Sequence, residues 1–527
     1  MASTPADGPT GTPAQEVPRP SEGYARYVLG ILVLVYMLNF IDRQILSILA
    51  EDIKADLGLT DADIGFLYGT AFGVFYALFG IPLGRLADSW NRVKLMAGGL
   101  ALWSAATAVS GFAKTGGMLT AARVGVGIGE ATASPCAYSL ISDYFPKEKR
   151  ATALAIYSSG LYIGGGLSLF IGGAIVQNWN AAFPGGGPLG LVGWQAAFLA
   201  VGLPGLLVAL WVASIREPLR GQSEGIVTPP PAQPFRGFFN ELMTVIPPLT
   251  LIGAMKRGPS AFAINLAVAA VIAAISAGLI ALTGDYPQWI AVGIGFYAVY
   301  SWATALRERD PPTFQLIWGT PAFLCTVLGY GLVAFLAYSG SFWSAPYALR
   351  VLGADPAIAG FIIGGSGAAG GFLGVVLGGR LADRWRRTNP SGRVIVIGLG
   401  LLLPILPLAV AFTTRDLMLF YAMQLPAQAL SSMALGAAAA TTQDLVLPRM
   451  RGAATATFFL GTTLIGLAMG PYIAGRVSLA IGDLGLGVLS LLAVVPISLA
   501  ALIYLYKALP RAEATVLDRA RAAGEVV

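Results

Sequence analysis

The sequence lacks the residues that most catalytic and metal sites need. It contains no histidine and only two cysteines, Cys136 and Cys325. Without histidine it cannot form a Ser-His-Asp triad, an HExxH zinc site or a histidine-ligated haem. Both cysteines lie in apolar segments, and two cysteines cannot build a disulfide framework or a thiolate metal site. No GxxxxGK[ST] motif occurs, so ATP does not drive this protein. We therefore predict no metal and no cofactor.

Charge is also scarce. Only 11% of the chain is charged and 56% is hydrophobic, whereas soluble globular chains carry about 25% charged residues. The 67 glycines suit the close packing of helices in lipid. This composition predicts an all-α polytopic membrane protein. The first 23 residues lack the basic start and apolar core of a secretory signal, and their Pro, Thr and Gly content predicts a disordered tail.

Long apolar runs predict fourteen membrane spans. A helix needs about 20 mostly apolar residues to cross a bilayer. Such runs cover roughly 25–50, 62–84, 93–113, 117–142, 151–176, 193–214, 260–284, 287–306, 318–348, 358–380, 393–413, 417–442, 453–480 and 484–507.

Basic residues are distributed unevenly between the two sets of connections. One set, together with both ends of the chain, carries 26 cations. The other set carries five, namely Lys54, Lys114, Arg350, Arg415 and Arg476. Because cytoplasmic loops are enriched in Lys and Arg, we predict that both termini are cytoplasmic. The net charge of +6 is then a signature of topology, and no nucleic-acid partner is expected.

Two short segments recur in the same order. "GRLADSWNR" (84–92) returns as "GRLADRWRR" (379–387), and "PKEKRATA" (146–153) has a looser echo in "PRMRGAA" (448–454). Their offsets of 295 and 301 residues indicate duplicated halves, separated by more chain than six spans need. The predicted domains are a disordered cytoplasmic tail (1–23), an N-terminal six-helix half (24–214), a linker with an interfacial segment and an inserted transmembrane hairpin (215–312), a C-terminal six-helix half (313–507) and a cytoplasmic tail (508–527).

The repeated element resembles the loop signature of the major facilitator superfamily. Gly84, Asp88 and Arg92 match that signature, while Ser89 and Asn91 depart from it. Within the superfamily, "NFIDRQI", "RVGVGIGEAT" and "SFWSAPYALR" look like the spinster branch of lipid transporters. The resemblance covers the twelve core spans but not the inserted hairpin. It implies the major facilitator fold, proton-coupled transport of sphingolipid-like or lysophospholipid-like amphiphiles, and a bacterial inner (plasma) membrane location.

Four charges lie inside predicted spans. Asp42 and Arg43 belong to the first span, and Arg123 and Glu130 belong to the fourth. A rise of 1.5 Å per residue places Glu130 about 10 Å deeper than the other three, on the same helix face as Arg123. Ionisable residues inside membranes are functional by default. We predict that Glu130 and Asp42 carry a coupled proton and that Arg43 and Arg123 bind an anionic head group. The alternative is that Asp42–Arg123 and Arg43–Glu130 are structural ion pairs that pin the two helices together.

Two polar neighbours extend this predicted substrate site. Asn39 lies three residues before Asp42 and borders the same side of the first span. Ser134 lies one turn after Glu130, where its hydroxyl can bond either a head group or its own helix backbone.

Residues at the span ends suggest gates. Asp88 and Asp383 hold equivalent positions in the repeated element, which in facilitator-type folds resembles a latch between the halves. From here on the twelve core spans are numbered without the hairpin. Arg150 and Arg451 lie at matching starts of the fifth (roughly 151–176) and eleventh (roughly 453–480) of these spans. They are the natural partners of the two aspartates, although topology alone also explains them.

A second predicted gate lies near the outer end of the seventh span. There "SGSFWSAPYALR" places Phe342 and Trp343 beside Gly340 and Pro346, which should break the helix. The two aromatic side chains could form an outer gate, and an interfacial aromatic belt is the alternative.

These features predict a secondary active transporter that works by alternating access. Its expected partners are an amphiphilic anionic or zwitterionic small molecule, protons and membrane lipids, and we expect a monomer. A carrier of a small organic anion or drug is the first alternative. A membrane enzyme acting on lipid head groups and a transporter-like receptor are the others. The absence of histidine and of any metal-spaced cluster argues against the enzyme.

Overall fold

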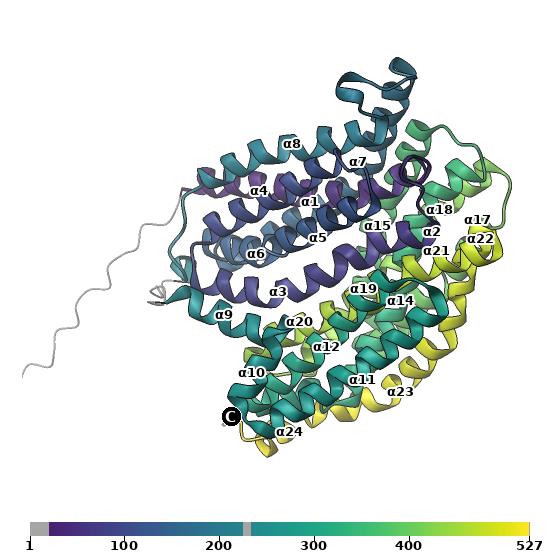
Figure 1. The fold of residues 1–527 in the computed structure, drawn as a ribbon. Helices are drawn as coiled ribbons and strands as arrows, with labels where there is room; N and C mark the ends of the chain where they lie inside the picture. Colours follow the sequence, from purple (N-terminus) through teal and green to yellow (C-terminus); the bar gives the residue numbers. More distant parts are fainter. Residues whose placement is uncertain (1–20, 225–232, 526–527) are drawn as a thin grey trace, which may run out of the picture.

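The structure is a computed structural model that describes residues 21–224 and 233–525. Within these ranges the chain forms helices joined by turns and contains no β-strand (Figure 1). Residues 1–20 of the predicted N-terminal tail and most of the Pro-rich stretch 228–234 lie outside the described residues. Glu22 and Gly23, which were predicted to belong to the tail, begin the first helix, with Ser21 as its N-cap.

The N-terminal half contains six spans in sequence. Their bounds are α1 (Glu22–Leu57); α2 (Asp61–Gly65), the π-helical η1 (Phe66–Thr70) and α3 (Ala71–Ser89); α4 (Arg92–Ser110); α5 (Gly116–Glu130) and α6 (Ala133–Tyr144); α7 (Lys147–Ala182); and, after η2 (Pro188–Gly190), α8 (Gly193–Ala213).

The connection between the halves contains the predicted hairpin. Its elements are η3 (Gln222–Glu224), α9 (Pro234–Val245), α10 (Leu249–Arg257), the hairpin helices α11 (Pro259–Thr283) and α12 (Tyr286–Arg309), and α13 (Pro311–Ile317). Helices α9 and α10 meet at an angle of 98°. The bend falls at Pro247 and Pro248, which cannot continue a helix in the ordinary way.

The C-terminal half repeats the six-span plan. Its elements are α14 (Pro321–Arg350); α15 (Pro356–Arg386); α16 (Gly392–Leu402) and α17 (Ile405–Ala411); α18 (Leu417–Ser432) and α19 (Ala434–Asp444); η4 (Pro448–Met450), α20 (Arg451–Gly461), the π-helical η5 (Thr462–Leu467) and α21 (Gly470–Ile481); α22 (Leu484–Ser490), η6 (Leu491–Val494) and α23 (Val495–Ala514); and the terminal α24 (Val516–Ala522).

The all-α membrane fold is confirmed. Twelve helices of the described chain are long and apolar enough to cross a membrane. The spans predicted at roughly 117–142 and 417–442 are also present, but each is divided into two helices, α5 with α6 and α18 with α19. In the fourth span, Pro135 has no N–H to donate to the carbonyl of Ala131, which lies in the break. The structure therefore accommodates all fourteen predicted spans.

The seam between the halves is lined by close helix contacts. The second span (α2, η1, α3) packs along the eleventh (α20, η5, α21), and α7 packs along α15. A Cβ atom on Gly65 would lie 2.5 Å from the carbonyl oxygen of Pro471, and one on Gly166 would lie 2.8 Å from that of Gly364. Only glycine allows backbones to approach this closely. The π-helical segments η1 and η5 also meet across this seam, and such segments are frequent at functional sites.

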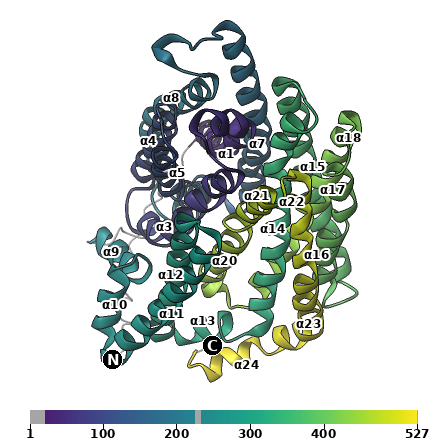
Figure 2. The same ribbon diagram turned by 45° about the vertical axis from the view of Figure 1, so that its right-hand side comes forward.

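The two hairpin helices occupy different environments. In its most apolar stretch, α12 is 67% buried and α11 is 0% buried. Figure 2 shows α12 between the two sets of helices, with α11 outside it, and α12 contacts both α3 and η5. The side chain of Gln288, at the start of α12, accepts a hydrogen bond from Thr70 Oγ1 at 2.6 Å and lies 3.5 Å from the carbonyl oxygen of Ala468. Helix α11 therefore lies on the outside of the bundle, whereas α12 packs against the seam between the halves.

Candidate functional site

The four charges inside the spans come together in the N-terminal half. Asp42, Arg43, Arg123 and Glu130 are each at least 91% buried. Arg43 Nη2 donates to Glu130 Oε2 at 2.8 Å. Arg123 Nη1 donates to the main-chain carbonyl of Asp42 at 3.1 Å, and no ion pair joins it to the Asp42 carboxylate in the described residues. One ion pair is thus closed, while the other acid and cation are not directly paired.

Aromatic rings surround the Arg43 guanidinium. Its Cζ atom lies 4.5 Å from the ring centroid of Phe72, 4.7 Å from that of Phe40 and 4.9 Å from that of Tyr76. Arg123 also stacks on Phe72, at 5.4 Å. The negative faces of these rings stabilise a desolvated cation without neutralising it. Arg43 therefore keeps its charge in an otherwise apolar setting, where its anionic partner is Glu130.

The cluster leaves many of its own polar atoms without a hydrogen bond. They are Asp42 Oδ1, Arg43 Nε, Trp103 Nε1, Thr107 Oγ1, Arg123 Nε and Nη2, and Glu130 Oε1. A buried polar group without a partner costs about 1–3 kcal/mol, and native structures contain few of them. The cluster therefore holds several buried donors and acceptors that a ligand could use.

Glycines bring Glu130 to this position. A Cβ on Gly127 would lie 2.5 Å from the carbonyl oxygen of Phe72, and one on Gly129 would lie 2.8 Å from that of Gly99. These contacts press α5 against both α3 and α4. Glu130 is the last residue of α5 and lies beside the break that precedes α6, where it meets Arg43 of α1.

The two polar neighbours differ in their relation to the cluster. Asn39 is buried, and its Oδ1 lies 3.5 Å from Arg43 Nη2, within the site. Ser134 is half-buried and lies near the Tyr157 hydroxyl. No hydrogen bond of the described residues joins it to the four charges, so Ser134 borders the cluster without belonging to it.

The seam is locked on one face of the molecule. We call this the far face; the opposite face, where the described chain begins and ends, is the terminal face. Arg350, at the end of α14, donates to Glu51 of α1 at 2.6 Å and to Asp61 of α2 at 2.7 Å. Lys54 also pairs with Asp61, and Ser478 of α21 donates to it at 2.7 Å. This group of five side chains is called the far-face lock below.

The predicted Phe342 and Trp343 lie inside the seam, just below this lock. Both are fully buried, so neither side chain lies in a lipid-facing belt. Phe342 stacks on Tyr68 of η1, with 4.1 Å between the ring centroids, and Trp343 Nε1 donates to the Pro471 carbonyl at 3.0 Å. Whether they gate the site remains a prediction.

The expected helix break in the seventh span was wrong, because α14 runs continuously from Pro321 to Arg350. Pro346 instead has a different effect. It has no N–H to donate to the carbonyl of Phe342, one turn earlier. That carbonyl accepts a hydrogen bond from Ser47 Oγ of the other half at 2.5 Å. The proline thus creates an acceptor for a bond across the seam.

Two of the four predicted latch residues on the terminal face, Asp383 and Arg150, are bonded within their own half or to the adjoining linker. Asp383 lies 3.6 Å from Arg393 in the C-terminal half. The described bonds of Arg150 go to the Ser142 carbonyl and to the Ser223 hydroxyl. Asp88 and Arg451 are exposed at the ends of their helices. The structure therefore does not bring these four residues together as a latch.

A repeated bundle of fourteen spans, with buried charges beside a seam closed on one face, defines a membrane transporter rather than an enzyme. The family model described as Major Facilitator Superfamily matches residues 32–390, and the chain belongs to this superfamily. It is a spinster-like member, as two kinds of relative indicate.

Among characterised proteins, an MFS-type efflux pump of Mycolicibacterium smegmatis is 28% identical over 94% of each chain. Protein spinster homolog 1 of Bos taurus is 26% identical over 87% of this chain and 74% of its own length. Among solved structures, a bacterial homolog of the human lysosomal transporter spinster, in an inward-facing and unoccupied conformation, is 28% identical. Its TM-score is 0.64, and the match covers 96% of this chain and 97% of that one.

Sequence reasoning missed two parts of the site. Phe72 and Tyr76 lie one helical turn apart in an apolar span, a spacing that ordinary packing also produces. Arg350 was noted only for its place in the topology. The sequence did contain a signal for its role. Arg350 is one of only five cations on that side of the membrane, and it ends a span on the same side as Glu51 and Asp61.

Proposed function

We propose that this protein is a proton-coupled secondary transporter of an amphiphilic lipid, of the lysophospholipid or sphingoid type, that works by alternating access. The observation that carries the proposal is the Arg43–Glu130 pair, a desolvated cation shared between one carboxylate and three aromatic rings. Protonation of Glu130 removes the charge that holds Arg43. An anionic head group can then take that place, while the rings provide apolar surface for the adjoining chain.

Coupling follows from charge balance. The four buried residues sum to zero when all are ionised, which is the condition for burying charges at tolerable cost. A proton on Glu130 or Asp42 leaves one positive charge in excess. Either a substrate anion or loss of the proton restores neutrality, so the two compete for the same cations.

We further propose that the terminal face is cytoplasmic, since it carries most of the cations. The described bonds between the halves come from Ser47, Glu51, Asp61, Thr70 and Gln177 in the N-terminal half, all in the part of the seam nearer the far face. This distribution corresponds to an inward-facing state, the state of the similar bacterial homolog. Transport would then require the far-face lock to open and contacts to form on the terminal face.

The test is Glu130→Gln in the purified protein reconstituted into liposomes. The amide mimics the protonated acid, so we expect counterflow exchange of a lysophospholipid to persist while accumulation driven by a pH gradient is lost. Glu308→Gln is the matched control, because Glu308 also pairs with an arginine, Arg257, but on the surface. Accumulation by Glu130→Gln with the full pH dependence of the unmodified protein would show that another group carries the proton.

The second candidate is a transporter of a small organic anion or drug. The efflux pump that matches 94% of the chain favours it. A pair of substrates separates the two functions, a lysophosphatidate and glycerol phosphate, which has the same head group without the tail. Uptake that requires the tail supports the lipid, whereas equal uptake of both supports the small anion.

A further inference from the structure

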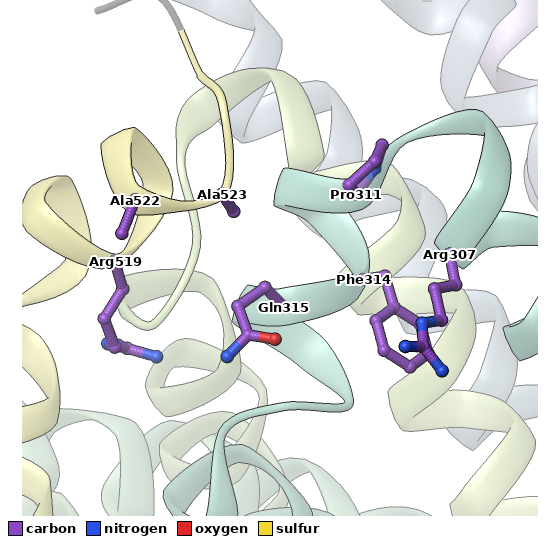
Figure 3. A pocket seen from close by; sticks show the side chains of 7 residues that line it. All are labelled: Arg307, Pro311, Phe314, Gln315, Arg519, Ala522 and Ala523. Atoms are coloured by element: carbon purple, nitrogen blue, oxygen red, sulfur yellow. The ribbon is translucent and has the colours of Figure 1, made fainter.

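A cavity on the terminal face lies well apart from the buried charges. It has a volume of about 390 Å³. Its walls come from the end of α12, from α13 and from the C-terminal α24 (Figure 3). The lining residues are Arg307, Pro311, Phe314, Gln315, Arg519, Ala522 and Ala523.

The cavity is positively charged. Its lining contains two arginines and no carboxylate. Arg307 stacks on Phe314, at 5.8 Å from the ring centroid, and its guanidinium makes no hydrogen bond or ion pair with the described residues. Arg519 donates to the Thr320 hydroxyl and to the Ala512 carbonyl but to no carboxylate of the described chain. In Figure 3 the Gln315 amide lies between the two arginines.

Two acids close to the cavity walls in the chain, Asp310 and Glu525, are engaged by Arg449. Arg449 donates to Asp310 at 2.8 Å and to Glu525 at 2.6 Å, which ties the end of the chain to the start of α13. This chain of charges holds α24 against α13 and closes one wall of the cavity. Asp310 and Glu525 are thereby paired with Arg449, and neither makes a described bond to Arg307 or Arg519. Burial lowers the pKa of Arg519, with no carboxylate opposing the shift.

We propose that this cavity is a binding site for a phosphate group. A guanidinium presents a planar set of donors that matches phosphate oxygens, and Arg307 has all of its donors available. The Gln315 amide adds a neutral donor between the two cations. A cavity of this size also has room for a glycerol-sized substituent beside the phosphate. The phosphate could belong to an anionic phospholipid of the adjacent leaflet or to a soluble phosphorylated metabolite.

Binding there would have a structural consequence. The site joins the inserted hairpin, through Arg307, to the C-terminal helix, through Arg519. A bound phosphate would clamp these two segments together and thereby link the seam helix α12 to the C-terminal half. This inference concerns ligand binding and does not depend on the transported molecule.

The test measures the thermal stability of the full-length protein in nanodiscs. In phosphatidylcholine nanodiscs, inorganic phosphate and glycerol phosphate are titrated. In a second arm, phosphatidylglycerol replaces part of the phosphatidylcholine without added phosphate. Stabilisation in the first arm identifies a soluble phosphate as ligand, and stabilisation in the second alone identifies the lipid head group. Either result supports the site, provided that it depends on Arg307. No stabilisation in either arm would overturn it.

Variants connect the effect to the cavity. Arg307→Gln should weaken binding by roughly tenfold or more, because a charge-assisted pair is lost. Arg307→Lys should lose less, since it keeps the charge without the planar donors. Arg519→Gln serves as a second variant. Because it also removes bonds within α24, a loss of binding in Arg519→Gln could reflect altered structure, so the proposal is judged on Arg307→Gln. Arg511→Gln, an exposed cation outside the cavity, is the control. Equal stabilisation of Arg307→Gln and the unmodified protein would refute the proposal.

Discussion

The two ends of the seam between the halves use their charges in different ways. On the far face, Arg350 of one half bonds Glu51 and Asp61 of the other. On the terminal face, where cations are far more numerous, charges pair locally, as Arg92 does with Glu217 at the start of the linker. The number of charges therefore does not decide which face is closed. What decides it is whether oppositely charged partners face each other across the seam.

The far-face lock is strong enough to hold the seam and weak enough to open. Its four charged side chains are 7–29% exposed. Surface ion pairs contribute about 0–1 kcal/mol, and fully buried ones cost several kcal/mol to break. A lock of intermediate exposure suits a transporter that must leave this state in every cycle.

The largest effect is expected from breaking the lock. Arg350→Gln removes the charge-assisted bonds to two carboxylates. Such bonds contribute about 1.5–3 kcal/mol each when shielded, and solvent screening lowers that value here. We expect the open form of the far face to become more populated by roughly tenfold, equivalent to about 1.4 kcal/mol. Spin labels at Ala55 and Leu479, both exposed on the far face, should report a longer distance.

Arg415→Gln is the control for this prediction. Arg415 is also an exposed far-face cation, but it has no ion pair in the described residues. An unchanged label distance in Arg350→Gln would mean that backbone packing of the second and eleventh spans, and not the lock, closes this face.

A smaller shift toward the open form of the far face is expected when a hydrogen bond of the inserted hairpin is removed. Gln288 of α12 bonds Thr70 and approaches the Ala468 carbonyl, and it is 1% exposed. Gln288→Leu should remove about 1 kcal/mol of net hydrogen bonding from the closed far face. The same label pair should therefore show a roughly fivefold population change.

Asn265→Leu is the matched control for Gln288→Leu. Asn265 is a buried amide in α11 that bonds only the Ala261 carbonyl of its own helix. If both variants behave alike, α12 does not help to hold the seam.

Substitutions on the terminal face should leave the state with a closed far face nearly unchanged. Asp383→Asn and Arg451→Gln remove charges that make no described bond across the seam. We expect the far-face label distance to stay the same. Uptake should slow, because the predicted latch can contribute only in the opposite state. A lengthened far-face distance in either variant would contradict the comparison between the two faces.

The smallest effect concerns pH and the C-terminal helix. Hydrogen bonds from Arg449 lower the pKa of Glu525 below its usual value of 4.5. Although burial raises the pKa of Asp310, its bonds to Arg449 lower it overall, below the usual 3.8. A carboxyl group whose pKa is lowered in the docked form stabilises that form fully at pH values above its usual pKa. This stabilisation is lost as the pH falls through the lowered pKa. The segment after Ala514 should therefore stay protected from hydrogen exchange at neutral pH and become exposed below about pH 4.

Arg449→Gln tests the sign of this dependence. The variant should show similar exposure of the segment at both pH values. If the unmodified protein loses protection as pH rises, the bonds of Arg449 do not hold α24.

The spans were predictable because hydrophobicity is a local property of the sequence. Runs of apolar residues located all fourteen, including the two that the structure divides. The division after Glu130 was less accessible, since a proline at 135 permits either a kink or a break. The predicted break at Pro346 was wrong, because a proline can also be accommodated inside a continuous helix. In α14 the helix continues, and the carbonyl freed by the proline bonds Ser47 of the other half.

The charged cluster was predicted as a set, and of the two ion pairs named in the alternative interpretation the described residues contain only Arg43–Glu130. Depth counting separated Glu130 from Arg43 by about 10 Å along the membrane normal, yet their side chains are bonded at 2.8 Å. Counting residues ignores helix tilt and the length of an arginine side chain. Asp42 and Arg123, placed at equal depth, are joined through a backbone carbonyl and not through their charges.

The sequence alone determined the number of spans, the duplicated halves, the resemblance to spinster-like transporters and the presence of four charges inside the membrane. Each of these depends on composition or on spacing along one helix. Only the tertiary structure decided that Arg43 lies among three aromatic rings, that Arg350 locks the far face and that Arg307 and Arg519 share a cavity. Apart from the Phe40–Arg43 contact within α1, those contacts join helices tens to hundreds of residues apart. Their geometry depends on how the helices pack, which no single segment encodes.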